Sequence, residues 1–497
     1  MAITPLNFLN LRDGRFDATS RTQLTQLFDA FAADGTQNMA VHFHGGLVSA
    51  DNAMATAERL LPEYRQDGVC YPMFFVWESG LFETIRNNTT QIANEEFFQK
   101  LLSKALQFVG GKVLQGLGGA RGEAVPNVDD TVVEAELAKA NQGAFPLMTA
   151  DRRAAVSELT EAEALQFRDM LEGDPSFMAQ VDLISNTVQP ADHMAKSRGA
   201  EVAGSTVTLM SPNVLADIAR ERKQEAPGAR GLLESVRLVK GGVVVVARVI
   251  ARFAQKRDHG FYATVVEEIL REFYLGAVGE TLWGLMKKAT ADAFAGNDLL
   301  FGGTAFLNEL KRVDPNNQMR VTLIGHSAGS EYICNLLSNA TAILGSQYQF
   351  DVVFMAPACR IEFFDDVLKH QIDHLRSLRM FTMFDAVEQQ DVLVPLVYPH
   401  SLLYFISGVL EDEADKPILG MERYLIGDAP FYQQPETGIP AIRAFFDADP
   451  NRKVFSVSVG TPGFETNSIH HGEFTNTIPP QGRATIDSVK FILKNGF

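Results

Sequence analysis

Residues 320–337 read RVTLIGHSAGSEYICNLL, and this stretch decides the fold. Its first five residues are a short, largely apolar run that predicts a buried strand, and its last eight predict a helix. Between the two lies a turn of small residues, Gly325 to Gly329. The stretch therefore predicts a strand, a sharp turn and a helix in direct succession.

Similar strand and helix units surround this stretch. Toward the C-terminus we predict a helix over 329–344, a strand over 350–355, a helix over 363–376, strands over 378–384 and 453–459, and a helix over 484–494. Toward the N-terminus we predict a helix over 21–33, a strand over 39–43, a helix over 53–66 and a strand over 69–77. Strands separated by helices form parallel sheets, so we expect an α/β protein with a mostly parallel, doubly wound sheet.

The middle of the chain has a different pattern. Residues 111–295 open with a Gly-rich stretch and continue with charged helical segments, and 202–210 is their best strand candidate. We therefore expect 1–110 and 296–497 to form one α/β core, interrupted by a mainly helical insertion or cap. Within this insertion, the apolar run 241–250 predicts a core or amphipathic helix, since it is too short to span a membrane.

Charged residues in the same insertion are interpreted as solvent-facing helix surfaces. This interpretation covers Glu267 and Glu268, inside the stretch TVVEEILRE, and the arginines between residues 248 and 257. Charge runs on helices usually face water because burying a charge without a partner is costly.

Composition excludes several classes of protein. The 497 residues include 44 Lys and Arg against 61 Asp and Glu, a formal net charge of −17. This excess disfavours nucleic acid as a partner, because binding it depends on phosphate neutralisation. Cys70, Cys334 and Cys359 lie in apolar stretches and are predicted to be buried free thiols, as suits a reducing compartment. No signal-peptide pattern or long apolar run is seen, so we expect a cytoplasmic protein without a transmembrane segment.

The turn in the deciding stretch carries a chemical signal. Gly325-His326-Ser327-Ala328-Gly329 matches G-x-S-x-G, the motif that places a serine nucleophile on a strained turn between a strand and a helix. The two glycines let the strand and the helix pack closely, and the helix N-terminus favours negative charge. A turn of small residues without chemistry is the alternative, but the flanking strand and helix favour a nucleophile.

A serine hydroxyl is a weak nucleophile and needs a base that an acid orients. His471 is our candidate base, because it follows the last predicted strand and precedes a glycine that lets the loop turn toward the serine. The adjacent His470 is the alternative.

The acid is expected after the strand over 378–384. Asp391 and Asp385 are the two candidates there, with Glu388 a remote third. We favour Asp391, because the sequence DVLVP over 391–395 resembles the acid loop of many lipases.

Acyl transfer also needs backbone donors for the charge that develops on the carbonyl oxygen. The strand over 39–43 is followed by His-Gly-Gly-Leu at 44–47, which is similar to the H-G-G motif of lipases and esterases. We therefore expect the N–H groups of Gly46, Leu47 and Ala328 to form an oxyanion hole.

His44 and His326 are expected to line the substrate pocket. Trp77 is a further candidate for that lining, but core packing is favoured for it, because it ends a predicted buried strand.

Two histidine pairs have spacings seen in metal sites. His370 and His374 are four residues apart on a predicted helix, but the Glu of H-E-x-x-H is missing. His42 and His44 alternate on a strand without the expected following Asp. We therefore predict no metal at either pair and interpret the first as an exposed helix face.

Together these motifs resemble those of the α/β-hydrolase superfamily, over the two parts of the predicted core. The resemblance implies a Ser-His-Asp triad, an acyl-enzyme intermediate and no cofactor. Carried onto this chain, Ser327 is the nucleophile, His471 the base, and Asp391 or Asp385 the orienting acid. The position of the insertion departs from the family pattern, because family caps more often lie later in the chain.

The expected activity is a serine hydrolase that cleaves a carboxylic ester, with a small-molecule or lipid-like acyl substrate. A serine peptidase or amidase is one alternative. A non-catalytic α/β-hydrolase scaffold, which would bind a protein partner through residues 111–295, is another.

Overall fold

The computed structural model describes residues 3–46, 49–77, 82–116, 158–188, 208–224, 236–395 and 397–497. Its centre is an eight-stranded sheet with the order β2-β1-β4-β3-β5-β6-β7-β8. The strands are β1 (Phe8–Arg12), β2 (Arg15–Phe16), β3 (Asn38–Phe43), β4 (Tyr71–Trp77), β5 (Arg320–His326), β6 (Phe350–Met355), β7 (Leu375–Met383) and β8 (Lys453–Ser456). Only the pair β1 and β2 is antiparallel. The prediction of an α/β protein with a mostly parallel sheet is confirmed.

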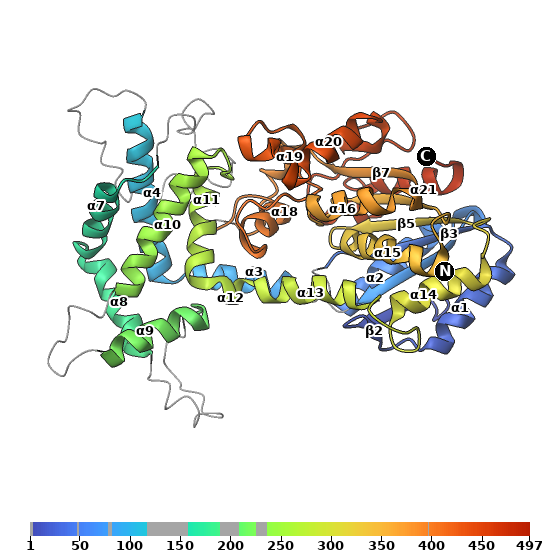
Figure 1. Cartoon of the computed structure of the whole chain (residues 1–497), viewed down its shortest axis with the longest axis horizontal. Helices are drawn as coiled ribbons and strands as arrows, with labels where there is room; N and C mark the ends of the chain where they lie inside the picture. The colour runs from blue at the N-terminus through green and yellow to red at the C-terminus, as the bar shows by residue number, and fades with distance from the viewer. Residues whose placement is uncertain are drawn as a thin grey trace.

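The central strands are buried on both faces. Every residue of β4 and β6 is buried, as are all but the first residue of β3 and of β5. Helices therefore cover both faces of the sheet, as parallel sheets require (Figure 1). They are α1 (Arg21–Asp34), α2 (Ala50–Tyr64), α14 (Gly302–Val313), α15 (Gly329–Leu344), α16 (Ile361–Gln371), α20 (Ile439–Asp447) and α21 (Arg483–Asn495).

The strand order reverses direction between β3 and β5. The chain passes from β3 outward to β4 on one side, and from β5 outward to β6 and β7 on the other. The carboxyl ends of two adjacent strands at such a reversal diverge into a crevice, which is where open α/β sheets bind ligands. The loops after β3 and β5 carry the two glycine motifs found in the sequence.

The sheet begins earlier in the chain than the sequence pattern predicts. β1 pairs with β4 and β2 forms the edge, although neither was predicted. The segment FLNLR of β1 has only three apolar residues, interrupted by Asn10. Its strand conformation depends on pairing with β4, a contact far away in the sequence.

The chain between β4 and α14 is mainly helical and contributes no strand to the sheet among its described residues. Its helices are α3 (Phe82–Ala93), α4 (Glu96–Gly116), α7 (Glu161–Glu172), α8 (Pro175–Thr187), α9 (Pro212–Gln224), α10 (Val236–Ala254), α11 (Phe261–Ile269), the π-helical η3 (Leu270–Tyr274), α12 (Leu275–Val278) and α13 (Glu280–Asp292). In Figure 1, α4 and α7 to α11 gather at the end of the molecule away from the sheet, and α12 and α13 lead back toward it.

Three details of this helical part differ from or refine the predictions. α4 runs across residue 110, so the predicted boundary falls inside a helix. Of the predicted strand over 202–210, residues 202–207 lie outside the described residues and 208–210 form no strand. The run 241–250 lies within α10, as predicted. Among the described residues, no helix is long and apolar enough to cross a bilayer.

The three cysteines are buried free thiols, as predicted. Cys70 lies just before β4, Cys334 within α15 and Cys359 just before α16. Each is enclosed by the apolar layers on the sheet.

Candidate active site

Ser327 sits on the turn between β5 and α15 in a left-handed backbone conformation, with φ 52°. This conformation is unfavourable for a residue with a Cβ, so the surroundings must hold it. The Ser327 N–H donates to the carbonyl of Met355 (2.9 Å). Its carbonyl accepts from the N–H groups of Ser330 (3.1 Å) and Ala358 (3.0 Å) and from the Ser330 hydroxyl (2.7 Å). The strained turn is therefore fixed by bonds to both neighbouring segments.

The two glycines of the turn are required by close packing. A Cβ at Gly325 would lie 2.8 Å from the Ile333 side chain and 3.0 Å from the backbone of Gly329. A Cβ at Gly329 would lie 2.2 Å from the carbonyl oxygen of Phe43. The steric reason for the G-x-S-x-G spacing is thus present in this structure.

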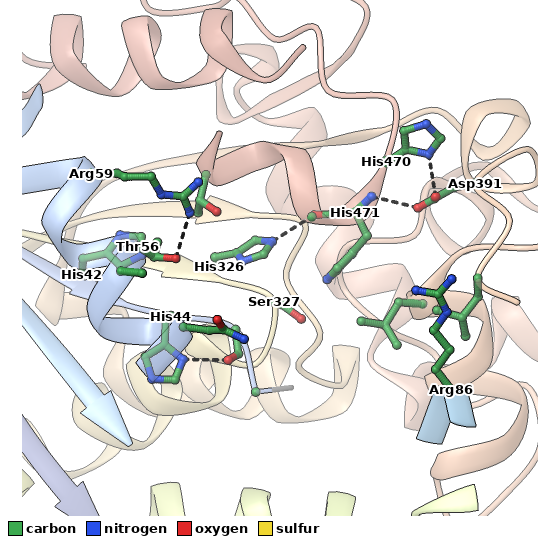
Figure 2. A pocket seen from close by; sticks show the side chains of 18 of the residues that line it. His42, His44, Thr56, Arg59, Arg86, His326, Ser327, Asp391, His470 and His471 are labelled. Carbon is green, nitrogen blue, oxygen red and sulfur yellow. Dashed lines mark hydrogen bonds and ion pairs between the residues drawn. The ribbon is translucent and has the colours of Figure 1, made fainter. Parts of the chain in front are cut away.

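The Ser327 side chain faces a cavity of about 800 Å³ at the carboxyl ends of the strands. The cavity is also lined by His44, Gly46, Asp391 and His471, which come from the loops after β3, β7 and β8. Figure 2 shows His44, Asp391 and His471 around Ser327. Four loops far apart in the sequence therefore bring the predicted nucleophile, base, acid and one oxyanion donor to one cavity.

His471 is held in this cavity by its main chain. Its N–H donates to Asp391 Oδ2 (2.8 Å), and its carbonyl accepts from His326 Nε2–H (3.0 Å). The ring points into the cavity toward Ser327 (Figure 2). Neither ring nitrogen has a hydrogen-bond partner among the described residues. Burial, and secondarily the nearby His326, lower the pKa of His471 well below 6.5, so the ring is a neutral base at pH 7.

The ring contact of Asp391 differs from the expected triad. Its Oδ1 accepts from His470 Nδ1–H (2.7 Å), while Oδ2 takes the His471 main chain. The Asp391 side chain is largely buried and that of His470 is about half exposed. Burial raises the pKa of Asp391, and the two hydrogen bonds oppose that shift. Asp391 thus holds the His470–His471 loop through one ring and one backbone group.

The loop after β3 is pressed against the serine turn. A Cβ at Gly45 would lie 3.3 Å from the Ser327 Cβ, and one at Gly46 would lie 2.5 Å from the Ala328 Cβ and 1.9 Å from the sulfur of Met286 on α13. Only glycine lets the backbone come this near to Ser327. Leu47, the third predicted oxyanion donor, lies outside the described residues.

His44 fixes the path of this loop. Its Nδ1–H donates to the carbonyl of Gly45 (2.7 Å), and its Nε2 accepts from the main-chain N–H of Trp77 (3.1 Å). Trp77 stacks on the His44 ring with 3.9 Å between the ring centroids and does not line the cavity. It therefore packs behind His44, as the core alternative for Trp77 proposed, while His44 and His326 line the cavity as predicted.

Burial keeps three histidines of the cavity neutral. It lowers the pKa of His44 and of His326 to about 4, and that of His42 well below 6.5. His42 bonds the hydroxyl of Tyr64 through Nδ1 (3.2 Å), and no partner for its Nε2 is found among the described residues. His42, His44 and His326 are therefore neutral imidazoles at pH 7.

One wall of the cavity was not predicted. Asn52, Ala55, Thr56 and Arg59 face it from α2, and Arg86 faces it from α3. The α2 residues are spaced i, i+3, i+4 and i+7, which is one face of a helix. This polar stripe is visible in the sequence, but nothing there says that it faces a cavity.

Asp385, the second candidate acid, lies elsewhere. It begins α17 (Asp385–Glu388), and its carboxylate accepts from the Tyr404 hydroxyl (2.5 Å) and the Gln389 side chain (2.7 Å). It lines a separate cavity of about 320 Å³ with His259 and Arg423. Of the two candidates, the structure places only Asp391 with Ser327.

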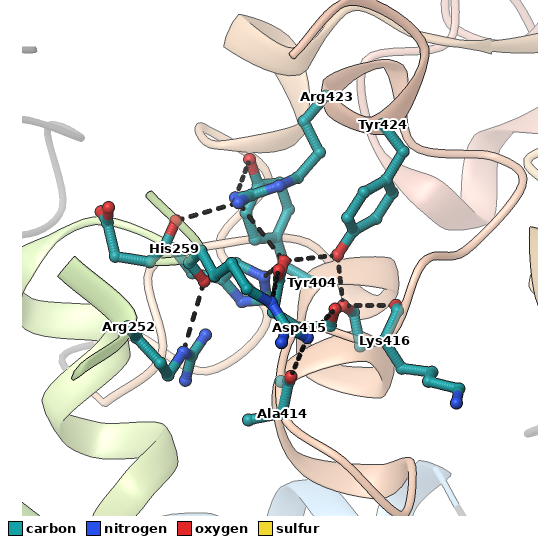
Figure 3. Close-up of polar contacts among 12 residues, drawn as sticks. Arg252, His259, Tyr404, Ala414, Asp415, Lys416, Arg423 and Tyr424 are labelled. Atoms are coloured by element: carbon teal, nitrogen blue, oxygen red, sulfur yellow. Dashed lines mark hydrogen bonds and ion pairs between the residues drawn. The ribbon is translucent and has the colours of Figure 1, made fainter. Parts of the chain in front are cut away.

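Beside this second cavity lies a buried charged cluster, centred on Asp415, that joins the helical insertion to the segment between β7 and β8 (Figure 3). The Asp415 carboxylate accepts from His259 (3.1 Å), Arg257 (3.0 Å), Tyr424 (2.8 Å) and Tyr432 (3.1 Å). The other ring nitrogen of His259 bonds Glu267 (2.7 Å). Both nitrogens thus face carboxylates, which is the bonding pattern of an imidazolium.

The predicted exposure of Glu267, Glu268 and Arg252 is therefore wrong. Glu267 and Glu268 are buried, and Arg252 on α10 pairs with both, at 2.7 and 3.1 Å. Helix α11 is buried along its whole length, because it lies between the insertion and the core. Arg252 and His259 supply the partners that make burial of these glutamates tolerable.

No group of three or more His, Cys, Asp or Glu side chains suited to a metal ion is found among the residues the structure describes. His370 is exposed, but His374 is buried and bonds Thr341 and the Tyr348 carbonyl. The interpretation as an exposed helix face therefore fails for His374.

Comparison with known proteins yields no match to a family model, to a curated protein or to a solved structure.

Proposed function

We propose that the protein is a serine hydrolase of the α/β-hydrolase type that cleaves a carboxylic ester through an acyl-enzyme intermediate. The observation that carries this proposal is Ser327 at φ 52°, on a glycine-flanked turn in a cavity that also holds His471. A strained, over-determined serine beside an unpartnered neutral imidazole is what nucleophilic catalysis needs. The order serine, acid, histidine along the chain agrees with that of α/β-hydrolases.

In the proposed reaction, the Ser327 oxygen attacks the carbonyl carbon while its proton passes to a ring nitrogen of His471. The carbonyl oxygen gains the negative charge, next to the backbone of Gly46 and Ala328 at the start of α15. The bond to the alkoxy oxygen then breaks, and the alcohol leaves with the proton from His471. A water molecule repeats these steps on the acyl-enzyme and releases the acid.

Asp391 and His326 act through His471 in this proposal. Asp391 accepts from the main-chain N–H of His471, and His326 donates to the His471 carbonyl. These two bonds fix the main chain of His471 and so the position of its ring relative to Ser327. A base that is held by its backbone keeps its ring nitrogens for the reacting groups.

The test is labelling of the purified protein with a fluorophosphonate probe. We expect the wild type and Ser346→Ala, which changes an exposed serine after α15, to be labelled, and Ser327→Ala to stay unlabelled. Hydrolysis of phenyl hexanoate should follow the same pattern. A wild type that neither reacts with the probe nor cleaves the ester would overturn the proposal and favour a binding scaffold. Faster cleavage of hexananilide than of phenyl hexanoate would favour an amidase.

A further inference from the structure

The charge balance of the Ser327 cavity is opposite to that of the whole chain. The chain has a net charge of −17, yet Asp391 is the one acidic side chain among the described residues that line this cavity, and Arg59 and Arg86 line it too. Both oxygens of Asp391 already have partners, His470 and the main chain of His471. The two arginines are therefore not neutralised by the wall in which they sit.

Arg59 does not form the i, i+4 ion pair with Glu63 that its position on α2 would allow. Glu63 lies one turn further along α2, at the spacing that usually forms an ion pair. Its carboxylate instead pairs with Arg483 (2.7 Å) and Lys490 (2.8 Å) on α21. Arg59 has one hydrogen bond to a side chain among the described residues, from Nη2 to the Thr56 hydroxyl (3.0 Å). That bond uses one of five N–H donors and leaves the guanidinium edge open to the cavity.

Arg86 lies across the cavity from Arg59. Figure 2 shows the two guanidinium groups on opposite sides of Ser327. Both side chains are exposed, and no ion pair of Arg86 is found with a residue whose side chain the structure describes. The lining of the same cavity also includes four apolar residues, Val392, Leu393, Pro395 and Leu402. The cavity thus offers an apolar surface for a hydrocarbon chain and cationic groups near its mouth.

From this arrangement we infer that the substrate is an ester that also carries an anionic group, such as a carboxylate or a phosphate, recognised by Arg59 or by Arg86. The inference rests on the ester hydrolysis proposed above and names its substrate class. Arginine binds carboxylates and phosphates through paired N–H groups, so an anion at the mouth gains charge-assisted hydrogen bonds that a neutral ester lacks. Because Arg59 and Arg86 are exposed, solvent weakens an ion pair between either arginine and the anion. The pair still favours an anionic ester over a neutral one.

Three esters test this inference. Phenyl hexanoate is neutral, monophenyl adipate carries a carboxylate at the end of the acyl chain, and 4-carboxyphenyl hexanoate carries it on the alcohol side. We expect at least one anionic ester to be cleaved with a kcat/KM about tenfold above that of phenyl hexanoate at low salt. The ester that gains identifies the side of the scissile bond on which the anion is held. Equal or lower values for both anionic esters would overturn the inference while leaving the ester hydrolase in place.

Arginine variants decide whether these residues cause the preference. In one of the single variants Arg59→Gln and Arg86→Gln, the ratio of anionic to neutral kcat/KM should fall several-fold, and in the double variant it should approach one. Arg220→Gln removes the same charge from the exposed face of α9 and should keep the wild-type ratio. A preference that survives in the double variant would contradict the assignment.

A binding measurement separates this inference from the proposed function. Monomethyl adipate and methyl hexanoate are titrated calorimetrically into Ser327→Ala, which cannot form an acyl-enzyme. We expect tighter binding of the anionic ester, lost in Ser327→Ala combined with Arg59→Gln and Arg86→Gln. If the wild type cleaves no ester, this titration still shows whether the cavity selects an anion, and equal affinities would reject it.

Discussion

The cavity around Ser327 and the cluster around Asp415 both contain buried polar side chains. Those of the cluster have hydrogen-bond partners, whereas a key side chain of the cavity has none among the described residues. In the cluster, the Asp415 carboxylate is surrounded by two arginines, a histidine and two tyrosines. In the cavity, the ring of His471 has no partner among the described residues, and Ser327 is held in a strained conformation. A buried polar group without a partner costs stability, so its presence points to a role other than holding the fold together.

The largest expected effect separates the two regions by activity. Replacing His471 with Ala should lower kcat for phenyl hexanoate about 10⁴-fold or more, because the serine loses its proposed base. Stability should stay the same or rise, since the ring forms no hydrogen bond with the residues that the structure describes. Activity assays and urea unfolding of the same preparation measure both quantities.

A matched variant controls this experiment. His370→Ala changes an exposed histidine on α16 and should alter neither quantity. A His471→Ala protein that is inactive only because it unfolds at much lower urea would contradict the assignment of a chemical role.

The second effect is on stability. Asp415→Asn keeps the shape of the side chain but removes the charge that faces His259, Arg257 and Arg423. Removing one member of a buried ion group leaves the others uncompensated, so we expect a loss of about 3–5 kcal/mol in the free energy of unfolding. Asp428→Asn removes an exposed partner of Lys256 nearby and should cost less than about 1 kcal/mol. Similar unfolding curves for the two variants would show that the cluster does not stabilise the fold.

The two regions also differ in how well the sequence predicts them. The strand, turn and helix around Ser327 are local, and the steric need for Gly325 and Gly329 leaves a mark in the sequence itself. The cluster has no such mark, because Arg252, Glu267 and Asp415 come together only when α10 and α11 pack on the segment before β8. Glutamates in a helix usually face water, so their burial could not be predicted without their partners.

The same reasoning explains what was missed in the site. Ser327, His471, Asp391 and His44 each follow a strand, and parallel strands bring their carboxyl ends to one edge. Arg59 lies in the middle of a helix, and its role depends on which face of α2 turns toward the cavity. The pairing of Asp391 with His470 depends on the loop conformation, because adjacent residues point in different directions.

A smaller effect is expected in the pH dependence of stability. Burial lowers the pKa of His326 to about 4, against about 6.5 in an unfolded chain. Between these values the unfolded chain binds a proton that the folded protein does not, so stability falls as pH drops from 6.5 to 4. In His326→Gln, whose amide can still donate to the His471 carbonyl, the loss between pH 7 and 4.5 should be smaller by about 2–3 kcal/mol.

Urea unfolding at the two pH values measures this difference. The stability that the Asp415 cluster contributes changes at lower pH. Burial raises the pKa of Glu267, but nearby His259 and Arg252 outweigh this effect and lower the pKa to about 2. This contribution is present above the unfolded value of about 4.5 and is lost toward pH 2. Parallel stability curves for the wild type and His326→Gln between pH 7 and 4.5 would mean that His326 has the same pKa in the folded protein as in the unfolded chain.

The smallest effect concerns the histidine that Asp391 binds through its ring. His470→Ala removes this contact but keeps the bond from Asp391 to the N–H of His471, so the base should stay close to its place. We expect kcat for phenyl hexanoate to fall about tenfold, the cost of one charge-assisted hydrogen bond that positions a loop. His470→Asn, which can still donate to Asp391, should recover part of the rate. A loss as large as that of His471→Ala, with no recovery by Asn, would instead make His470 the base, with Asp391 on its ring as in a triad.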